Sequence, residues 1–248
     1  MPLAMNDKTI TNQQLAALAH RFNTPEFIKS DPVQFPHRYS RREDVEVSGF
    51  VTAWISWGNR KQIIKTAEMI DSELFEGNPY GYLQSGKWAQ YQGDERCFYR
   101  TCKYKDFYSL MNRLDSVYRE FGNLENAVVA KMTEGLNPAA ALSRLFAGIP
   151  GVADATKKSP CKRLWFFLRW MVRRDGIVDL GIWTRISPKD LIIPLDVHVF
   201  EMAHAMGITT RRSADIRAAE EITNRFRQVF PDDPALGDFA LFGLGVGQ

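Results

Sequence analysis

One segment near the middle of the chain restricts the possible folds more than any other. Residues 157–174 contain many basic side chains and no acidic one, and apolar side chains fill most positions between the charges. On an α-helix, with 100° between residues, Lys162, Arg169 and Arg173 fall within about 20° of a single line. The remaining helix surface is almost wholly apolar, which is typical of a buried helix. The segment therefore predicts a core helix over about 161–174 that carries one basic stripe.

The basic stripe limits where this helix can lie. Removing a cation from water is costly unless the cation meets an anion. Lys162, Arg169 and Arg173 must therefore line a cleft or reach acidic side chains from other parts of the chain. Acidic residues recur between residues 215 and 238, whereas residues 157–174 contain none.

A second, shorter run supplies a candidate partner for the stripe. Pro194 interrupts regular structure, and a helical pattern of apolar residues follows from Val197 to Met206. Asp196 therefore stands where the N-cap of that helix belongs. Two interpretations remain open: Asp196 only caps the helix, or it is a functional acid that works with Lys162.

Lys162 at the head of an apolar helix, followed by the run Pro194-Leu-Asp-Val-His-Val199, resembles a signature of the helix-hairpin-helix superfamily of DNA glycosylases. In that superfamily a lysine opens a helix after the hairpin, and an aspartate lies in a Val/Leu-Asp-Thr/Val-His/Arg-Val sequence. The spacing of 34 residues (196 − 162 = 34) is nearer the archaeal 8-oxoguanine branch than the eukaryotic enzymes. The resemblance is specific over about 145–207.

The chain as a whole is similar to a bacterial family of proteins of unknown function. The shared segments are the run from Cys161 to Arg173, the Pro-Leu-Asp-Val-His run and the closing segment Asp238–Gly245. This similarity covers nearly the whole chain.

The glycosylase resemblance implies an all-α fold of two helical subdomains with a cleft between them. Residues 41–207 would form a helical bundle that carries Lys162 and Asp196. Residues 1–40 and 208–248, with part of the middle, would form the second subdomain.

The resemblance also implies a chemistry. A lysine amine is a nucleophile only in its neutral form, which burial and nearby cations favour. Lys162 would attack C1′ of a flipped-out nucleotide, the base would leave, and the resulting imine would permit strand cleavage. Asp196 would steady the cationic sugar and assist proton transfer. The implied activity is a base-excision repair DNA glycosylase with AP lyase activity on a damaged base of duplex DNA, oxidised purines included, without a metal or cofactor.

Further residues would contact the DNA by the same resemblance. The chain departs from the glycosylase pattern mainly at the hairpin. Its Gly148-Ile-Pro-Gly sequence is only weakly similar to the glycine-rich sequence that holds a phosphate in that superfamily. Lys157, Lys158 and helix-start amides would hold phosphate instead. The alternative is that Trp57 is core, Asn59 is a cap and His198 is an ordinary histidine. The candidate DNA contacts are Trp57, Asn59, Arg60, Lys157, Lys158, Arg163, Arg169, Arg173 and His198.

Helix-start signals agree with an all-α chain. Thr11 with Gln14, and Ser40 with Glu43, each fit a capping box. Several capping residues precede a proline suited to the first helical turn. Together the signals predict helices at about 11–21, 41–56, 60–75, 79–85, 106–121, 123–133, 138–147, 161–174, 188–192, 196–206, 213–229 and 234–243, with breaks at 86–105 and 147–160.

Composition sets the remaining limits. A content of 45% hydrophobic and 25% charged residues indicates a globular protein, and a net charge of +3 does not by itself establish nucleic-acid binding. Three cysteines and the absence of a signal peptide or membrane span favour the cytoplasm. The basic and aromatic run 96–105 suits DNA contact or is a solvated surface. A helical DNA- or RNA-binding protein without catalysis is the alternative function.

Overall fold

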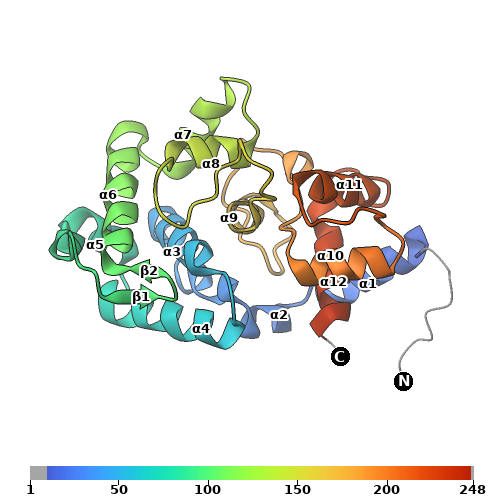
Figure 1. Ribbon diagram of the computed structural model, residues 1–248, viewed down its shortest axis with the longest axis horizontal. Coiled ribbons are helices and arrows are strands. Elements are labelled where there is room, and N and C mark those ends of the chain that lie inside the picture. Colours follow the sequence, from blue (N-terminus) through green and yellow to red (C-terminus); the bar gives the residue numbers. More distant parts are fainter. Residues whose placement is uncertain (1–9, 247–248) are drawn as a thin grey trace.

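The computed structural model describes residues 10–246, and nearly all of its regular structure is helical (Figure 1). This confirms the expected all-α class. The α-helices are α1 (Asn12–Phe22), α2 (Pro25–Ser30), α3 (Arg42–Ile55), α4 (Arg60–Met69), α5 (Pro79–Ser85), α6 (Tyr104–Phe121), α7 (Leu124–Met132), α8 (Pro138–Leu145), α9 (Lys162–Val172), α10 (Val197–Ala205), α11 (Ile216–Arg227) and α12 (Gly237–Val246). Short 3-10 turns are η1 (Pro32–Gln34), η2 (Pro36–Arg38), η4 (Lys87–Tyr91), η5 (Pro188–Asp190) and η6 (Pro234–Leu236), and η3 (Ile70–Leu74) is a π-helical end to α4.

Most of the predicted helix starts are confirmed by their cap hydrogen bonds. Thr11 and Gln14 form the expected capping box, and the side chains of Asn78 and Asn137 accept backbone N–H groups at the starts of α5 and α8. The capping box at Ser40 is wrong. Helix α3 begins at Arg42, and its N-cap makes no side-chain hydrogen bond to the helix.

The structure contains one small β-element that the sequence did not predict. Strands β1 (Cys97–Tyr99) and β2 (Cys102–Lys103) form an antiparallel hairpin beside α4 and α6 (Figure 1). The hairpin occupies the break expected at 86–105. Helix α2 is a second element that the predicted pattern lacks.

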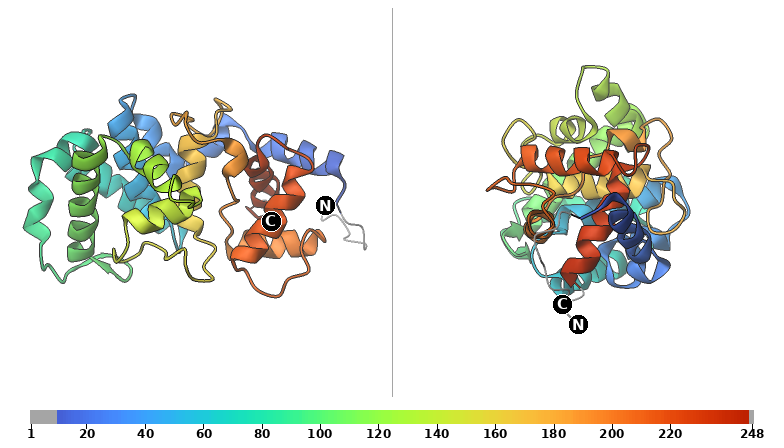
Figure 2. Two further views of the ribbon diagram at one scale, coloured as in Figure 1. Left: turned by 90° about the horizontal axis from the view of Figure 1, so that it is seen from above. Right: turned by 90° about the vertical axis from the view of Figure 1, so that its right-hand side faces the viewer.

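Two groups of helices lie on either side of α9. Figures 1 and 2 show α3–α8 on one side and α1, α10, α11 and α12 on the other. Helix α12 packs against both α1 and α10. A Cβ at Gly243 would lie only 2.0 Å from the Phe22 ring, so the absence of a side chain there allows α12 to approach α1. Because α10 packs on α12, it belongs with the C-terminal group, although the predicted boundary at 207/208 placed it with the bundle.

Helix α9 is the buried central helix that the apolar pattern predicted. It packs against α3 and α8, and Trp165, Phe167 and Leu168 are fully buried. Along the described residues 10–246, no helix combines the length and apolar character needed to cross a membrane.

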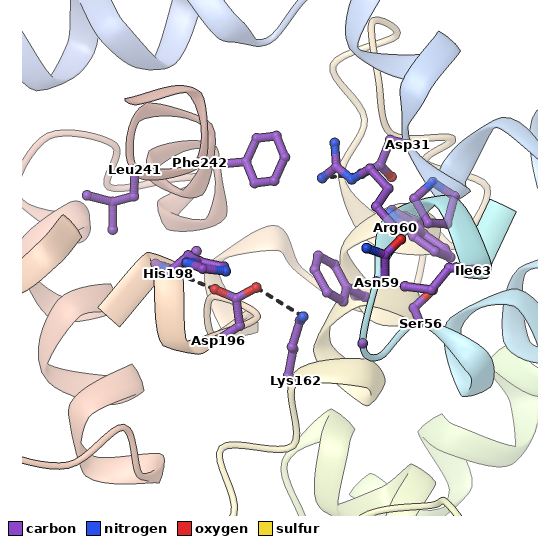
Figure 3. Close-up of a pocket in the computed structure, with 15 residues that line it drawn as sticks. Asp31, Ser56, Asn59, Arg60, Ile63, Lys162, Asp196, His198, Leu241 and Phe242 are labelled. Carbon is purple, nitrogen blue, oxygen red and sulfur yellow. Dashed lines mark hydrogen bonds and ion pairs between the residues drawn. The ribbon is translucent and has the colours of Figure 1, made fainter. Parts of the chain in front are cut away.

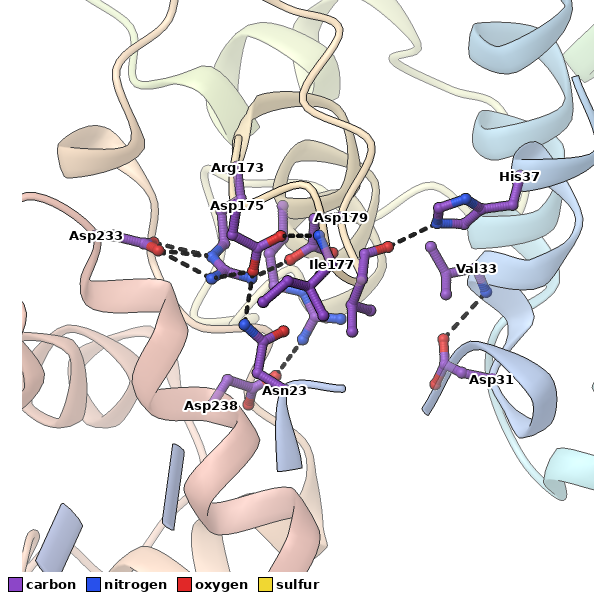
Figure 4. A network of polar contacts seen from close by, with 12 residues as sticks. Asn23, Asp31, Val33, His37, Arg173, Asp175, Ile177, Asp179, Asp233 and Asp238 are labelled. Atoms are coloured by element: carbon purple, nitrogen blue, oxygen red, sulfur yellow. Dashed lines mark hydrogen bonds and ion pairs between the residues drawn. The ribbon is translucent and has the colours of Figure 1, made fainter. Parts of the chain in front are cut away.

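The basic stripe of α9 is largely neutralised inside the protein. Arg169 donates to Asp238 at 2.6 Å and lies 3.3 Å from Asp179, and both carboxylates are buried. Arg173 is fully buried and binds Asp179 as well as Asp233 (Figure 4). The prediction that Arg169 and Arg173 contact DNA is therefore wrong, because neither guanidinium reaches solvent. The other expectation, that the stripe meets acidic side chains, is confirmed at these two positions.

This network joins α9 to the C-terminal group of helices, so breaking it should be costly. In Arg173→Met, Asp179 is deprived of a cation that touches it in a fully buried position. Removing one partner of a buried ion pair typically costs about 3–5 kcal/mol. We expect a decrease of that size in the free energy of unfolding, measured by urea denaturation. Lys157→Met is the control, because its 3.6 Å pair with Asp154 is exposed and should contribute at most about 1 kcal/mol. A decrease below about 1 kcal/mol in Arg173→Met would contradict this expectation.

Candidate active site

A cavity of about 430 Å³ lies between the two groups of helices (Figure 3). Its walls come from segments that are far apart in the sequence: the turn between α3 and α4, the starts of α9 and α10, and α12. The lining residues are Asp31, Pro32, Ser56, Gly58, Asn59, Arg60, Ile63, Lys162, Phe166, Trp170, Asp196, His198, Val199, Leu241 and Phe242.

Lys162 and Asp196 meet in this cavity. The Lys162 Nζ lies 3.0 Å from Asp196 Oδ2, and each side chain keeps about a quarter of its surface exposed, 27% and 24%. Asp196 is also the N-cap of α10, because its Oδ1 accepts the Val199 N–H at 2.8 Å. The two interpretations of Asp196 are therefore compatible: one oxygen caps the helix and the other faces the amine.

The start of α9 fixes the position of Lys162. Cys161, its N-cap, has φ +50° and ψ +36°, a left-handed conformation that is uncommon for a residue with a side chain. Cys161 is buried, and its N–H donates to Ser159 Oγ at 3.2 Å. Backbone strain held by the surrounding structure often accompanies a functional position. Here it turns the chain so that the first residue of a buried helix opens into the cavity.

The opposite wall comes from the turn between α3 and α4. Gly58 has φ +92°, which favours glycine. Asn59 caps α4 by accepting the Lys61 N–H at 2.9 Å, so the cap interpretation holds, and Asn59 also lines the cavity. Arg60 lines it too and extends over the Phe242 ring, with its guanidinium 4.6 Å from the ring centre.

The remaining predicted DNA contacts lie in different places. Arg163 lies outside this cavity, because its Nη1 donates to the Trp54 carbonyl at 2.6 Å and its guanidinium lies 5.8 Å from the Trp57 ring centre. Trp57 is half-buried and does not line the cavity. His198 lies at the rim with 84% of its side chain exposed.

Lys157 and Lys158 are exposed on the loop that precedes α9. This loop reaches the other group of helices, since the Lys158 carbonyl accepts the Ile216 N–H of α11 at 3.2 Å. Neither lysine lines the cavity.

Several lining residues were missed by the sequence analysis. Phe166 lies one helical turn after Lys162, and the Lys162 Nζ is 5.1 Å from its ring centre, so helical spacing could have found it. Asp31 and Phe242 have no comparable signal, because they come from distant segments. Asp31 is only 5% exposed, and burial raises the pKa of its carboxyl.

The family comparison covers every residue of this site. A protein-family model described as "Protein of unknown function (DUF2400)" matches residues 31–247 of the 248-residue chain. The chain belongs to the DUF2400 family. No curated protein and no solved structure matches it. Membership of a family of unknown function is thus confirmed, and in this DUF2400 protein the matched region begins at Asp31 and includes Lys162 and Asp196.

A second carboxyl group, that of Asp238, lies close enough to the Lys162–Asp196 pair for both of their charges to act on it. Asp238 is 3% exposed, and only its Oδ2 has a hydrogen-bond partner among residues 10–246. Burial raises the pKa of Asp238 to about 7, although the nearby Arg169 and Lys162 oppose the shift, and the negative charges of Asp196 and Asp179 add to it. Among residues 10–246, no group of three or more His, Cys, Asp or Glu side chains could hold a metal ion.

The raised pKa of Asp238 makes the stability of this DUF2400 protein depend on pH. The unfolded carboxyl titrates near about pH 3.9, so between that pH and about 7 the folded state holds the proton more tightly. Protonation therefore stabilises the fold at low pH, and this contribution disappears as the pH rises through about 7. We expect the free energy of unfolding of wild type, relative to Asp238→Asn, to fall over this window. A difference that stays constant with pH would contradict the assignment.

Proposed function

We propose that this DUF2400 protein is a DNA glycosylase with AP lyase activity, in which Lys162 is the nucleophile and Asp196 its acid/base partner. The observation that carries the proposal is the 3.0 Å contact between the amine and the carboxylate in a cavity large enough for a nucleobase. A neutral amine is needed for attack, and a carboxylate at hydrogen-bond distance can take its proton. The helix-hairpin-helix glycosylase resemblance supports the same pairing of these two positions.

The first half of the reaction releases the base. A damaged nucleotide is flipped out of the duplex into the cavity. Lys162 Nζ forms a bond to the sugar C1′ while the glycosidic C–N bond breaks, and the base leaves with the electron pair and gains a proton. Asp196 then faces a sugar on which positive charge develops, and a fixed anion is a strong stabiliser of such a transition state.

The second half cleaves the strand. The bond between C1′ and the ring oxygen then breaks, the oxygen keeps the electron pair and gains a proton, and the nitrogen lone pair forms the C=N double bond of the imine. A base removes a C2′ proton, and the 3′ phosphate leaves in a β-elimination.

Phe166, Trp170 and Phe242 give the cavity aromatic surfaces suited to a planar base. Within the glycosylase class, we favour oxidised purines as the substrates to test first.

A strand-cleavage assay tests the proposal. Duplexes that each contain one damaged base, oxidised purines and oxidised pyrimidines among them, are incubated with wild-type protein and separated on denaturing gels. We expect base release and nicking of at least one lesion duplex but not of its undamaged control. If wild type binds duplex DNA tightly and cleaves none of the lesion duplexes, the protein is a helical nucleic-acid-binding protein without this activity.

The loop before α9 should contribute to DNA affinity. In the double variant Lys157→Glu/Lys158→Glu, two exposed cations become anions. The slope of log affinity against log salt concentration is negative. Each phosphate that no longer meets a cation should make this slope less negative by about 1, since fewer counterions are released. Fluorescence anisotropy with a labelled duplex measures the affinity and its dependence on salt concentration. The control is Lys29→Glu, an exposed lysine of α2 outside the cavity. An unchanged slope in the double variant would remove this loop from the DNA-binding surface.

A further inference from the structure

Helix α4 borders two cavities. One face lines the cavity described above. The other face lines a second, more open cavity of about 410 Å³. The helical residues of that second face recur at positions 62, 65, 66 and 69, and the opposite wall comes from the β1–β2 hairpin. The lining residues are Gln62, Lys65, Thr66, Met69, Phe98, Tyr99 and Arg100.

The second cavity is positively charged. Lys65 and Arg100 are exposed, and no acidic residue lines the cavity. Neither cation forms an ion pair with any residue in the described range 10–246, whereas the other basic side chains of the hairpin region are paired with carboxylates. Those pairs are Arg96–Asp94, Lys103–Glu95 and Lys105–Glu95. The hairpin thus leaves one guanidinium unneutralised, and that guanidinium lies at the cavity.

Arg100 is held in place by the surrounding chain. Its φ is +54°, a left-handed conformation that is uncommon for a residue with a side chain. Its guanidinium stacks over the Trp57 ring, 4.5 Å from the ring centre. A Cβ at Gly58 would lie 2.3 Å from Arg100 Nη1, so the guanidinium rests against the bare backbone of the α3–α4 turn. Tyr99 fastens the hairpin to the same turn by donating its hydroxyl proton to the Trp57 carbonyl at 2.5 Å.

We propose that the second cavity binds the sugar–phosphate backbone of DNA next to the nucleotide in the first cavity, with Arg100 and Lys65 contacting phosphate. This inference rests on the proposed function. Arg60, in the first cavity, and Lys65 are five residues apart on α4, or about 7.5 Å along the helix axis. The two cavities are therefore neighbours along α4. A pre-positioned guanidinium suits phosphate because its fork of N–H donors matches two phosphate oxygens.

The test is the salt dependence of DNA binding. The probe is a labelled duplex with a stable abasic-site analogue, and the variants are Arg100→Ala, Lys65→Gln and their combination. We expect the dissociation constant of the double variant to rise about tenfold. Its slope of log affinity against log salt concentration should become less negative by about 1 to 2, because each removed cation would otherwise neutralise about one phosphate. Arg100→Lys should retain the wild-type slope because it keeps the charge. Lys87→Gln, an exposed lysine outside both cavities, is the matched control and should behave as wild type.

The outcomes separate this inference from the proposed function. If wild type binds the duplex and the Arg100 and Lys65 variants keep its affinity and slope, the second cavity does not bind phosphate, whatever the protein catalyses. If the variants weaken binding as expected but wild type cleaves no lesion duplex, the phosphate site stands and the glycosylase proposal fails. If wild type binds no DNA, both fail. Thermal melting checks that the variants fold. If Arg100→Ala does not fold, Lys65→Gln alone tests the inference.

Discussion

Lys162→Gln should abolish strand cleavage while leaving DNA binding largely intact. Glutamine has no nucleophilic amine, so neither attack on C1′ nor imine formation can occur. Its side-chain amide can still donate a hydrogen bond to Asp196 Oδ2, which now faces Lys162 at 3.0 Å. The fold and the cavity should therefore persist. Denaturing gels measure cleavage, and fluorescence anisotropy measures affinity for the same lesion duplex.

Lys29→Gln is the control for Lys162→Gln, because it removes an exposed amine from α2 without touching the cavity. It should cleave like wild type. If Lys162→Gln cleaves a lesion duplex at the wild-type rate, Lys162 is not the nucleophile.

Asp196→Asn should slow the reaction by about 100- to 1000-fold, the effect typical when one preorganised stabiliser of a charged transition state is removed. Stability should change little. Asp196 Oδ1 caps α10 through the Val199 N–H, and asparagine is about as good an N-cap as aspartate. The substitution thus removes the charge that faces Lys162 and keeps the cap. Single-turnover cleavage rates and thermal melting measure the two effects.

Asp215→Asn is the matched control for Asp196→Asn. Asp215 caps α11 in the same way, with its Oδ1 accepting the Ala218 N–H at 2.9 Å, but it lies outside the cavity. It should show wild-type rates. If Asp196→Asn keeps full activity, Asp196 is only a cap.

The parts of this structure that the sequence predicted are those with a local signal. The core helix α9 follows from an apolar pattern over eleven residues, and the cap of α10 follows from Asp196 and the proline before it. The 3.0 Å contact between Lys162 Nζ and Asp196 Oδ2 has no such local signal, because hydrophobic periodicity does not show that two positions 34 residues apart meet in the fold. The sequence pattern left open whether Asp196 works with Lys162, and the glycosylase resemblance favoured that pairing.

Arg169 and Arg173, which were wrongly predicted to contact DNA, show what a local sequence pattern does not determine. A basic residue on an apolar helix has the same local pattern whether it faces DNA or a buried carboxylate. For Arg169 the partners are Asp179 and Asp238, ten and 69 residues away, and only the folded chain identifies them. The hairpin was missed for a related reason, since strands of three and two residues are too short to show an alternating pattern.

The most direct test of the central claim is to locate the covalent adduct. A lesion duplex that wild-type protein cleaves is incubated with the protein in the presence of borohydride, which reduces an imine to a stable amine. The cross-linked protein is then digested and mapped by mass spectrometry. We predict a sugar adduct on the Lys162 Nζ, the amine that lies beside Asp196 in the cavity. An adduct on a different lysine, or base release with no adduct at all, would contradict the claim.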